Sequence, residues 1–373
     1  MRIFFATGEA SGDMLAAALA GAMREFEPQA CFRGIGGERM RAAGFTLTTR
    51  TTGWASLGPV AALRRIPPLL LNMLRHALWL RLRPYDLVVL IDFGAYNLRF
   101  ARALRTLGYR RPILYFFPPG AWLDRARQAR AVAASTVPLV PFEHQRDFFR
   151  SLGYEVPYFG HPLASLVNAR PPRVPAPRDG GVAAILPGSR RGEIEWHLPR
   201  LLDAAVLLQE RRPNARFIVS LASDEAASYA EPFLRAQRYA RLASRMVRGA
   251  EAAFDVADAA WIASGTAVLE AALREVPTVA LYVLAPAQAA IGYRVWLRHH
   301  PYITLPNVLL GREIVPELLQ ENATPPQLCD ALDRLLADPA PQLEAMRAVR
   351  AALGPSDALR RCATFATALA RSA

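Results

Sequence analysis

The chain opens with RIFFATGEASGD (residues 2–13), an apolar run that passes directly into a loop of small residues and then into a helical pattern. Two later stretches repeat this arrangement: LPGSR (186–190) and SGTAVLE (264–270) each follow an apolar run and lead into a helix. Small residues at a strand-to-helix turn let the backbone approach a ligand, and the free amides at the helix start favour an anion. One such loop is a weak signal. Three of them, spread over two parts of the chain, predict two nucleotide-binding halves that face each other across a cleft.

Strand alternates with helix in both halves, which is typical of a doubly wound α/β sheet. Residues 2–7 and 87–92 predict buried parallel strands, because strands covered on both faces are continuously apolar. A Pro- and Gly-rich linker at 168–181 ends the first half, and the pattern then restarts with VAAIL (182–186). We therefore expect two Rossmann-like domains, 1–167 and 182–340, and a helical tail, 341–373, that packs on the N-terminal domain or on a partner subunit.

The composition narrows the class of ligand. A length of 373 residues suits two domains, and 52% hydrophobic residues allow a sizeable core. The formal charge is +13, and because the chain contains no lysine, all 45 basic residues are arginine. This excludes a Walker lysine, a Schiff-base lysine and a lysine general base. The arginines are interleaved with leucine and alanine, which favours a phosphorylated ligand or an anionic lipid surface over nucleic acid.

The cysteines and the termini point to a cytoplasmic protein. Cys31, Cys329 and Cys362 lie far apart and match no metal spacing, so we expect a reducing compartment and no metal site at these residues. We also expect no cofactor. The chain begins with a predicted strand and not with the basic leader and cleavage site of a signal peptide. No uncharged apolar run reaches about 20 residues, so no membrane span is expected.

Two stretches, 39–85 and 276–312, contain no acidic residue. The first carries eight arginines among many leucines, and we expect Pro67 and Pro68 to interrupt any single long helix there. One interpretation is a pair of core-facing helices with solvated arginines. The other is an interfacial surface, residues 57–82, that sits on anionic lipid. The second acid-free stretch favours the lipid interpretation.

Short motifs follow one another along nearly the whole chain: GEASGD (8–13), IDFGAYN (91–97), FGHP (159–162), LPGSR (186–190) with Glu193, ASGTA (263–267) with Glu270, LPN (305–307) and GRE (311–313). In this order the set resembles the bacterial lipid-A-disaccharide synthase family, glycosyltransferases of the two-domain GT-B architecture. The resemblance implies transfer of a diacylglucosamine from its UDP donor to an acylated glucosamine 1-phosphate, with inversion, without a metal, at the inner face of the bacterial inner membrane. It also leaves open a homodimer through the C-terminal helices.

Inverting transfer needs a base for the acceptor hydroxyl and stabilisation of the departing diphosphate. Asp92 ends a buried strand, where α/β sheets place their ligands, and the resemblance makes it the general base. Its structural alternative is a helix cap or a buried hydrogen-bond acceptor. Arg190 can donate forked hydrogen bonds to the diphosphate, and its alternative is a surface ion pair with Glu193 or Glu195.

The other candidates form two groups. For the group expected to bind the acceptor, the structural alternatives are a helix cap and, for the histidine, a hydrogen-bonded core residue. Asp13 is the residue expected to be the cap. In the UDP group, Glu270 is alternatively a solvated helix acid and Asn307 a residue that only shapes its turn. The acceptor group is Glu9, Ser11, Asn97 and His161. The UDP group adds to Arg190 the residues Gly188, Ser189, Ser264, Gly265, Thr266, Glu270 and Asn307.

The chain departs from the family pattern in its acceptor half. The family usually has APDFN where this chain has FGAYN (93–97), and SPSVWAWR where it has FPPGAWLDR (117–125). A carboxylate is missing, and the tryptophan and arginine positions are displaced. The alternatives are a GT-B enzyme with another acceptor, a UDP-sugar epimerase and a non-catalytic nucleotide- or lipid-binding paralogue. A dehydrogenase ranks last, because no Gly-x-Gly-x-x-Gly follows a strand.

Overall fold

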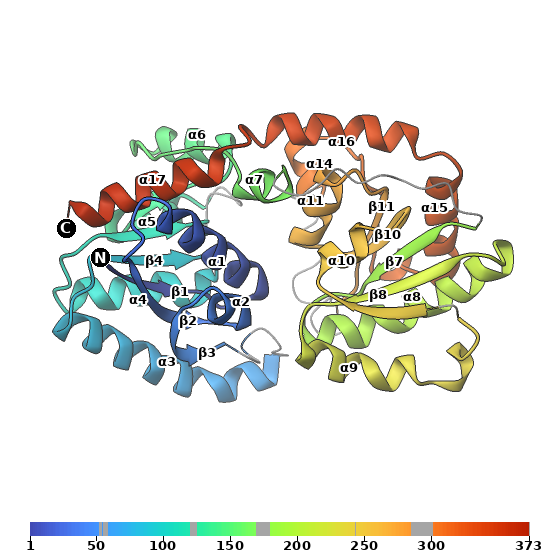
Figure 1. The fold of residues 1–373 in the computed structure, drawn as a ribbon, viewed down its shortest axis with the longest axis horizontal. Helices are drawn as coiled ribbons and strands as arrows, with labels where there is room; N and C mark the ends of the chain where they lie inside the picture. The colour runs from blue at the N-terminus through green and yellow to red at the C-terminus, as the bar shows by residue number, and fades with distance from the viewer. Residues whose placement is uncertain are drawn as a thin grey trace. The chain divides into compact units, whose positions relative to one another are not determined.

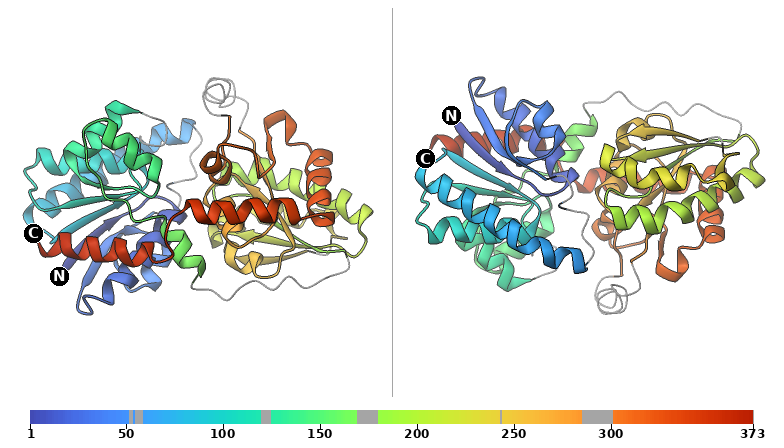
Figure 2. Two further views of the ribbon diagram at one scale, coloured as in Figure 1. Left: turned by 90° about the horizontal axis from the view of Figure 1, so that it is seen from above. Right: turned by 90° about the horizontal axis from the view of Figure 1, so that it is seen from below.

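The computed structural model describes residues 1–51, 54, 59–119, 125–168, 180–242, 244–284 and 301–372, with only the backbone described for 59–66. The chain divides into two compact units, Met1–Ala169 with Leu353–Ala373 (unit 1) and Arg170–Ala352 (unit 2). Within the described residues, each unit holds a six-stranded parallel sheet between two layers of helices (Figure 1 and Figure 2). The expected α/β class with two Rossmann-like domains is therefore confirmed.

Unit 1 orders its strands β3-β2-β1-β4-β5-β6. The strands are β1 (Arg2–Ala6), β2 (Cys31–Gly36), β3 (Thr46–Arg50), β4 (Leu87–Ile91), β5 (Ile113–Phe116) and β6 (Val137–Leu139). The helices are α1 (Ala10–Arg24), α2 (Glu38–Ala42), α3 (Pro59–Leu82), α4 (Gly94–Thr106), α5 (Ala126–Ser135), α6 (Glu143–Ser151), α7 (Pro162–Asn168) and α17 (Ala358–Arg371).

Unit 2 repeats the plan in the order β12-β11-β10-β7-β8-β9. The strands are β7 (Val182–Leu186), β8 (Arg216–Leu221), β9 (Ser244–Arg248), β10 (Ala259–Ala263), β11 (Thr278–Tyr282) and β12 (Glu317–Leu319). The helices are α8 (Arg191–Arg211), α9 (Asp224–Leu234), α10 (Ala250–Phe254), α11 (Thr266–Leu273), α14 (Leu305–Leu310), α15 (Pro325–Ala337) and α16 (Ala340–Ala352), with short 3₁₀ helices η2 (Gln237–Tyr239) and η4 (Gln320–Asn322).

The central strands are apolar throughout because helices cover both of their faces. Every residue of β4, β7 and β10 is buried. Along β1, Ile3 and Phe5 pack with α1, whereas Phe4 and Ala6 pack with α3 and α4 on the other face. Burial on two faces explains why these strands are recognisable as continuous apolar runs.

The C-terminal helices are shared between the two units. α16 belongs to unit 2, and the chain then returns to unit 1, where α17 lies along α1. Its buried residues Cys362, Ala363, Ala366 and Ala370 join the core that contains Ile3 and Phe5. The predicted tail, 341–373, is therefore not one element. The linker residues 169–179 lie outside the described residues.

The prolines do not interrupt α3, so that expectation was wrong. α3 is a single helix of 24 residues with Pro67 and Pro68 inside it. A proline removes one backbone donor, and since both prolines are exposed, water can satisfy the carbonyls one turn earlier. None of the described helices combines the length and the apolar character that a membrane span requires.

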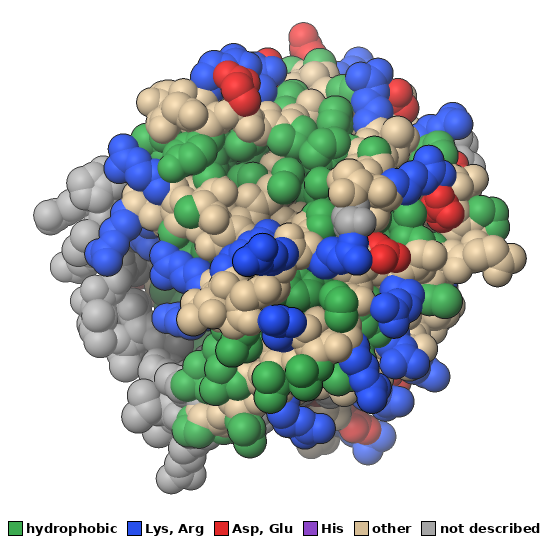
Figure 3. Space-filling view, turned by 90° about the vertical axis from the view of Figure 1, so that its left-hand side faces the viewer, with side chains coloured by type: hydrophobic (Ala, Val, Ile, Leu, Met, Phe, Trp, Pro, Cys, Tyr) green, Lys and Arg blue, Asp and Glu red, His purple; other side chains and the backbone are tan. Residues whose placement is uncertain are grey.

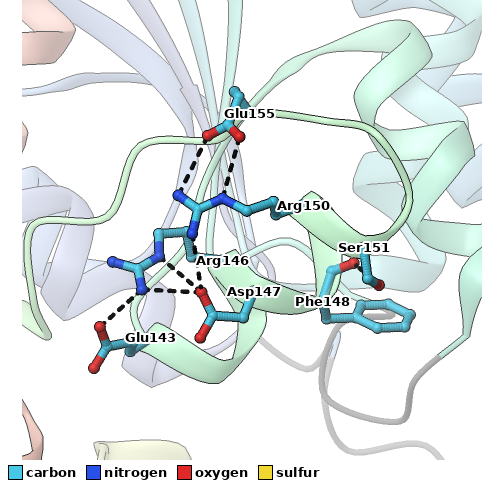
Figure 4. A network of polar contacts seen from close by, with 7 residues as sticks. All are labelled: Glu143, Arg146, Asp147, Phe148, Arg150, Ser151 and Glu155. Atoms are coloured by element: carbon cyan, nitrogen blue, oxygen red, sulfur yellow. Dashed lines mark hydrogen bonds and ion pairs between the residues drawn. The ribbon is translucent and has the colours of Figure 1, made fainter.

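Charged side chains along α6 pair with one another at the surface of unit 1 (Figure 4). Arg146 contacts Glu143 at 2.8 Å and Asp147 at 2.9 Å, and Arg150 contacts Glu155 at 3.1 Å. Exposed pairs of this kind contribute little to stability and are screened by salt. These arginines are therefore paired with acidic neighbours within unit 1.

Candidate functional site

Unit 1 gathers its candidate residues where its strand order reverses. β1 and β4 are neighbours, with Ala6 paired to Leu90, and the helices that follow them cover opposite faces of the sheet. Glu9 and Ser11, both half-buried, follow β1, and Asp92, which is exposed, follows β4. In open α/β sheets, ligands bind outside the carboxyl ends of the strands at such a switch point.

Asp92 lies in an unusual backbone turn. Its φ is 47° and that of Phe93 is 49°, which places two consecutive non-glycine residues in the left-handed region. Each such residue costs about 1–3 kcal/mol, and such strain clusters at active sites and ligand clamps. The Tyr115 hydroxyl donates to the Asp92 carbonyl at 2.9 Å and helps to hold the turn.

Asn97 holds the same turn from below. Its side-chain Nδ2 lies 3.2 Å from the Ala6 carbonyl, 3.1 Å from that of Ile91 and 2.9 Å from that of Asp92. The side chain is fully buried, and its Oδ1 has no hydrogen-bond partner among the described residues. The expected contact with an acceptor is not available to a side chain committed in this way. The structure gives Asn97 a positioning role, which ties the ends of β1 and β4 together.

Asp13 is a cap, but of a different helix from the one expected. Sequence reasoning assigned it to the helix in which it lies, whereas the structure shows it buried and capping α2. The side chain of Glu9, at the N-cap of α1, makes no capping hydrogen bond. The Asp13 carboxylate accepts from the backbone N–H groups of Gly37 at 2.7 Å, Arg39 at 2.8 Å and Met40 at 3.2 Å.

His161 is a core histidine. Its Nδ1 accepts from the Leu163 amide at 3.1 Å, its own amide donates to the Leu353 carbonyl at 2.9 Å, and its ring packs against Phe117 and Phe142. Complete burial lowers the pKa of His161 to about 3, so the ring is neutral near pH 7. Because the ring is buried, it cannot make the predicted contact with the acceptor. His161 is instead the hydrogen-bonded core histidine that was its structural alternative.

Unit 2 repeats the arrangement at its own switch point. β7 and β10 are neighbours, with Leu186 paired to Ile262, and both end in loops of small residues. The loop after β7 carries Gly188, Ser189 and Arg190, and the loop after β10 carries Ser264, Gly265 and Thr266.

Glu193 shapes the loop after β7. Its Oε2 accepts from the Ser189 amide at 2.9 Å and the Arg190 amide at 3.2 Å. Gly188 has a φ of 111°, and a side chain there would collide with Glu193. The Arg190 guanidinium lies 3.4 Å from Glu193 Oε1, with 36% of the side chain exposed, so the ion pair weighed as the alternative is present. A partly exposed pair at this distance is weak enough to give way to a diphosphate.

His197 is a positioning residue that the sequence motifs did not single out. Its Nδ1 lies 2.8 Å from the Pro187 carbonyl and its Nε2 accepts from the Val283 amide at 3.0 Å, so the ring joins the ends of β7 and β11. Burial lowers the pKa of His197, which keeps the ring neutral. One signal was available: His197 follows Glu193 by four residues and therefore shares its face of α8.

The loop after β10 leads into α11. The Ser264 amide donates to the Leu281 carbonyl at 2.9 Å, Gly265 is exposed, and Thr266 begins the helix. A helix start of this kind presents backbone N–H groups and a partial positive charge to an anion. Glu270 lies one turn further along α11 and is only 8% exposed, so it is not the solvated acid weighed as its alternative.

Asn307 shapes its turn. The side chain is fully buried, its Oδ1 accepts from the Ile314 and Val315 amides at 2.8 and 2.9 Å, and its Nδ2 donates to the Glu317 carboxylate at 2.8 Å. These contacts leave it no exposed atom for UDP. Sequence reasoning had left this role open, and the structure favours it.

Solved structures with the same fold include two enzymes of UDP-sugar chemistry. UDP-GlcNAc 2-epimerase from Neisseria meningitidis, bound to UDP-GlcNAc, has a TM-score of 0.65 at 12% identity and covers 98% of this chain and 99% of its own. A UDP-forming trehalose-phosphate synthase from Burkholderia vietnamiensis has a TM-score of 0.56 at 16% identity, with complete coverage of both chains. At these identities the likeness shows the fold alone, which is that of a GT-B protein.

Sequence comparison shows the family. The model for lipid-A-disaccharide synthetases matches residues 3–358. The lipid-A-disaccharide synthase of Aromatoleum aromaticum is 38% identical over 350 residues, covering 90% of this chain and 87% of the relative. That of Pseudomonas paraeruginosa is 35% identical over 363 residues, covering 95% and 94%. The chain belongs to the lipid-A-disaccharide synthetase family.

Proposed function

We propose that this chain is an inverting hexosyltransferase that joins a diacylglucosamine, carried by UDP, to an acylated glucosamine 1-phosphate, forming the lipid A disaccharide and UDP. The observation that carries the proposal is the exposed Asp92 in a strained turn at the β1–β4 switch point. Family membership supports the choice of substrates. That the two halves face each other across a cleft stays a prediction.

In this mechanism, Asp92 accepts the proton of the acceptor hydroxyl while the hydroxyl oxygen attacks the anomeric carbon of the donor. The attack comes from the side opposite UDP, the bond between that carbon and the UDP oxygen breaks, and the configuration inverts. Glu9, at the N-cap of α1, and Ser11, in the first turn of that helix, bind the acceptor sugar or its phosphate. No step uses a metal or a cofactor.

The departing diphosphate is stabilised from unit 2. Arg190 releases Glu193 and donates to phosphate oxygens, and the amides at the start of α11 add to this. Gly188 and Ser189 bring the backbone close to the phosphates, and Glu270 accepts from the ribose hydroxyls. Asn97 acts by holding the Asp92 turn, whereas His161 holds the start of α7 and Asn307 holds the segment that leads into β12.

The protein works at the cytoplasmic face of the inner membrane, bound peripherally to anionic lipid. Exposed leucines along α3 support this, namely Leu70, Leu71, Leu74, Leu78 and Leu82. Figure 3 shows arginine and apolar side chains interspersed on the end of unit 1 that carries both termini, with few acidic side chains. Apolar side chains among cations are typical of an interfacial surface. Of the second acid-free stretch, residues 285–300 lie outside the described residues.

A homodimer through the C-terminal helices stays a prediction. The buried face of α17 is already used within its own chain. A partner would therefore meet the exposed side, which includes Arg360, Arg361 and Thr364.

The test combines a product assay with two variants. The purified chain, given UDP-diacylglucosamine and the acylated glucosamine 1-phosphate, should release UDP and yield the disaccharide by mass spectrometry. Asp92→Asn should lower turnover by about 10²–10⁴-fold while the Kd for UDP stays unchanged, because only proton transfer is lost. Arg190→Ala should instead raise the Kd for UDP.

The contrary outcomes separate the alternatives. UDP binding without turnover would indicate a non-catalytic paralogue, and a product without acyl chains would indicate an epimerase or a transferase with another acceptor. Near-normal turnover of Asp92→Asn would show that Asp92 is not the base.

A further inference from the structure

Phe93, the residue after Asp92, belongs to a cluster of three aromatic rings. The mechanism does not use these rings. Phe93 lies 6.0 Å from Trp54 and 5.8 Å from Tyr96 between ring centroids, and Trp54 lies 5.3 Å from Tyr96. Tyr96 is buried, whereas Trp54 and Phe93 are each half-buried. The rings therefore form an apolar surface at the carboxyl end of β4, next to the predicted base.

The position of the Phe93 ring is fixed from several sides. A Cβ on Gly8 would overlap this ring, so the ring covers the backbone at the end of β1. Gly94 lies against Pro119 in the same way, which leaves the turn little room to move. From the buried side, the Tyr96 hydroxyl donates to Asn72 Oδ1 at 3.1 Å. Such an anchored ring can bind a ligand at little cost in conformational entropy.

The left-handed backbone of Phe93 is conformationally strained. A bulky side chain is uncommon at a φ of 49°. Strained non-glycine residues cluster at active sites and ligand clamps, and half-exposed Phe93 directly follows the predicted base.

We propose that Phe93 and Trp54 form an acceptor platform, an aromatic surface that binds an apolar C–H surface of the acceptor and so determines acceptor specificity. This inference rests on the proposed function and deepens it. Aromatic faces pack well against C–H groups, and the surface lies where the acceptor hydroxyl must reach Asp92. Two parts of an acylated sugar offer this chemistry, namely the pyranose face and the first carbons of an acyl chain.

The test measures steady-state kinetics of the full chain with short-chain acylated glucosamine 1-phosphate as acceptor. Phe93→Ala and Trp54→Ala should each raise the KM for the acceptor about tenfold or more, with the KM for the UDP donor and the pH profile of kcat unchanged. The matched control is Phe148→Ala, which removes a half-buried ring of the same unit from α6 and should leave the acceptor KM unchanged.

Further measurements keep the outcomes distinct. Repeating the kinetic measurements with deacylated glucosamine 1-phosphate shows which part of the acceptor contacts the rings. A similar rise in KM indicates the pyranose face, and no rise indicates the acyl chain. Phe93→Leu keeps the apolar bulk and should give an intermediate KM even if Phe93→Ala fails to fold. A fall in kcat with unchanged acceptor KM would overturn the platform, because Phe93 would then only position Asp92. An inactive wild-type chain would instead refute the proposed function.

Discussion

Neutral histidines hold loops in both units of the molecule. His161 secures the start of α7, and His197 joins the ends of β7 and β11. Each uses a ring nitrogen as acceptor for a backbone amide, and a protonated ring has no lone pair to offer. Desolvation lowers the pKa of both rings, so each ring is neutral near pH 7. Protonation at low pH would break these hydrogen bonds.

For His161 the pH dependence of stability has a definite sign. The pKa is 6.5 in the unfolded chain and about 3 in the folded one, so between these values the unfolded state binds the extra proton. The contribution of His161 to the free energy of unfolding should therefore be constant above about pH 6.5 and fall by about 1.4 kcal/mol per pH unit between about pH 6.5 and pH 3. Denaturant titrations at several pH values would measure this slope. His161→Asn keeps an acceptor for the Leu163 amide and should remove the His161 part of the slope, as measured against the wild type.

At the scale of single elements, α3 has two apolar faces with different surroundings. Met73, Ala77 and Leu80 are buried against the sheet of unit 1. Leu71 is 63% exposed and Leu74 and Leu78 are each 52% exposed, at helical spacing on the other side. The apolar residues of α3 therefore fit both interpretations of the acid-free segment. One side of the helix faces the core, and the other carries a row of exposed leucines.

Replacing Leu71, Leu74 and Leu78 together with serine should weaken binding to vesicles that contain anionic lipid, because the exposed row supplies the apolar contact area. Cosedimentation would measure the bound fraction, and the melting temperature should change little. The control is Met246→Ser, which removes an apolar side chain 58% exposed on β9. Equal binding of the triple variant and the wild type would show that α3 does not contribute to membrane binding.

At the scale of the whole molecule, unit 1 needs the end of the chain for its core. α17 buries four small or apolar residues against α1 after the chain has passed through unit 2. Unit 1 therefore cannot complete its fold until the last residues have been synthesised, whereas unit 2 contains its own core within one continuous segment.

Ala366→Arg should destabilise unit 1 by about 3 kcal/mol or more, because it places a bulky charge in a packed helix interface. Calorimetry should then resolve an early unfolding transition for unit 1 and a later one for unit 2, and UDP should still stabilise the later transition. Thr364→Arg changes an exposed position of the same helix and should have little effect. A single shifted transition would show that the units unfold together.

Local patterns were sufficient for the two sheets and for the loops that carry Asp92 and Arg190. Strands buried on both faces are apolar along their length, and small residues mark the loops where helices begin, so both signals lie within a few neighbouring residues. The burial and hydrogen-bond partners of Asn97, His161 and Asn307 could not be predicted in this way. Their partners lie on other elements, and whether a polar side chain faces a ligand or a backbone carbonyl depends on packing. The same holds for the choice between the N-terminal domain and a partner subunit as the surface on which α17 packs, and for the rings around Phe93, because burial is a property of the assembled fold and not of a segment.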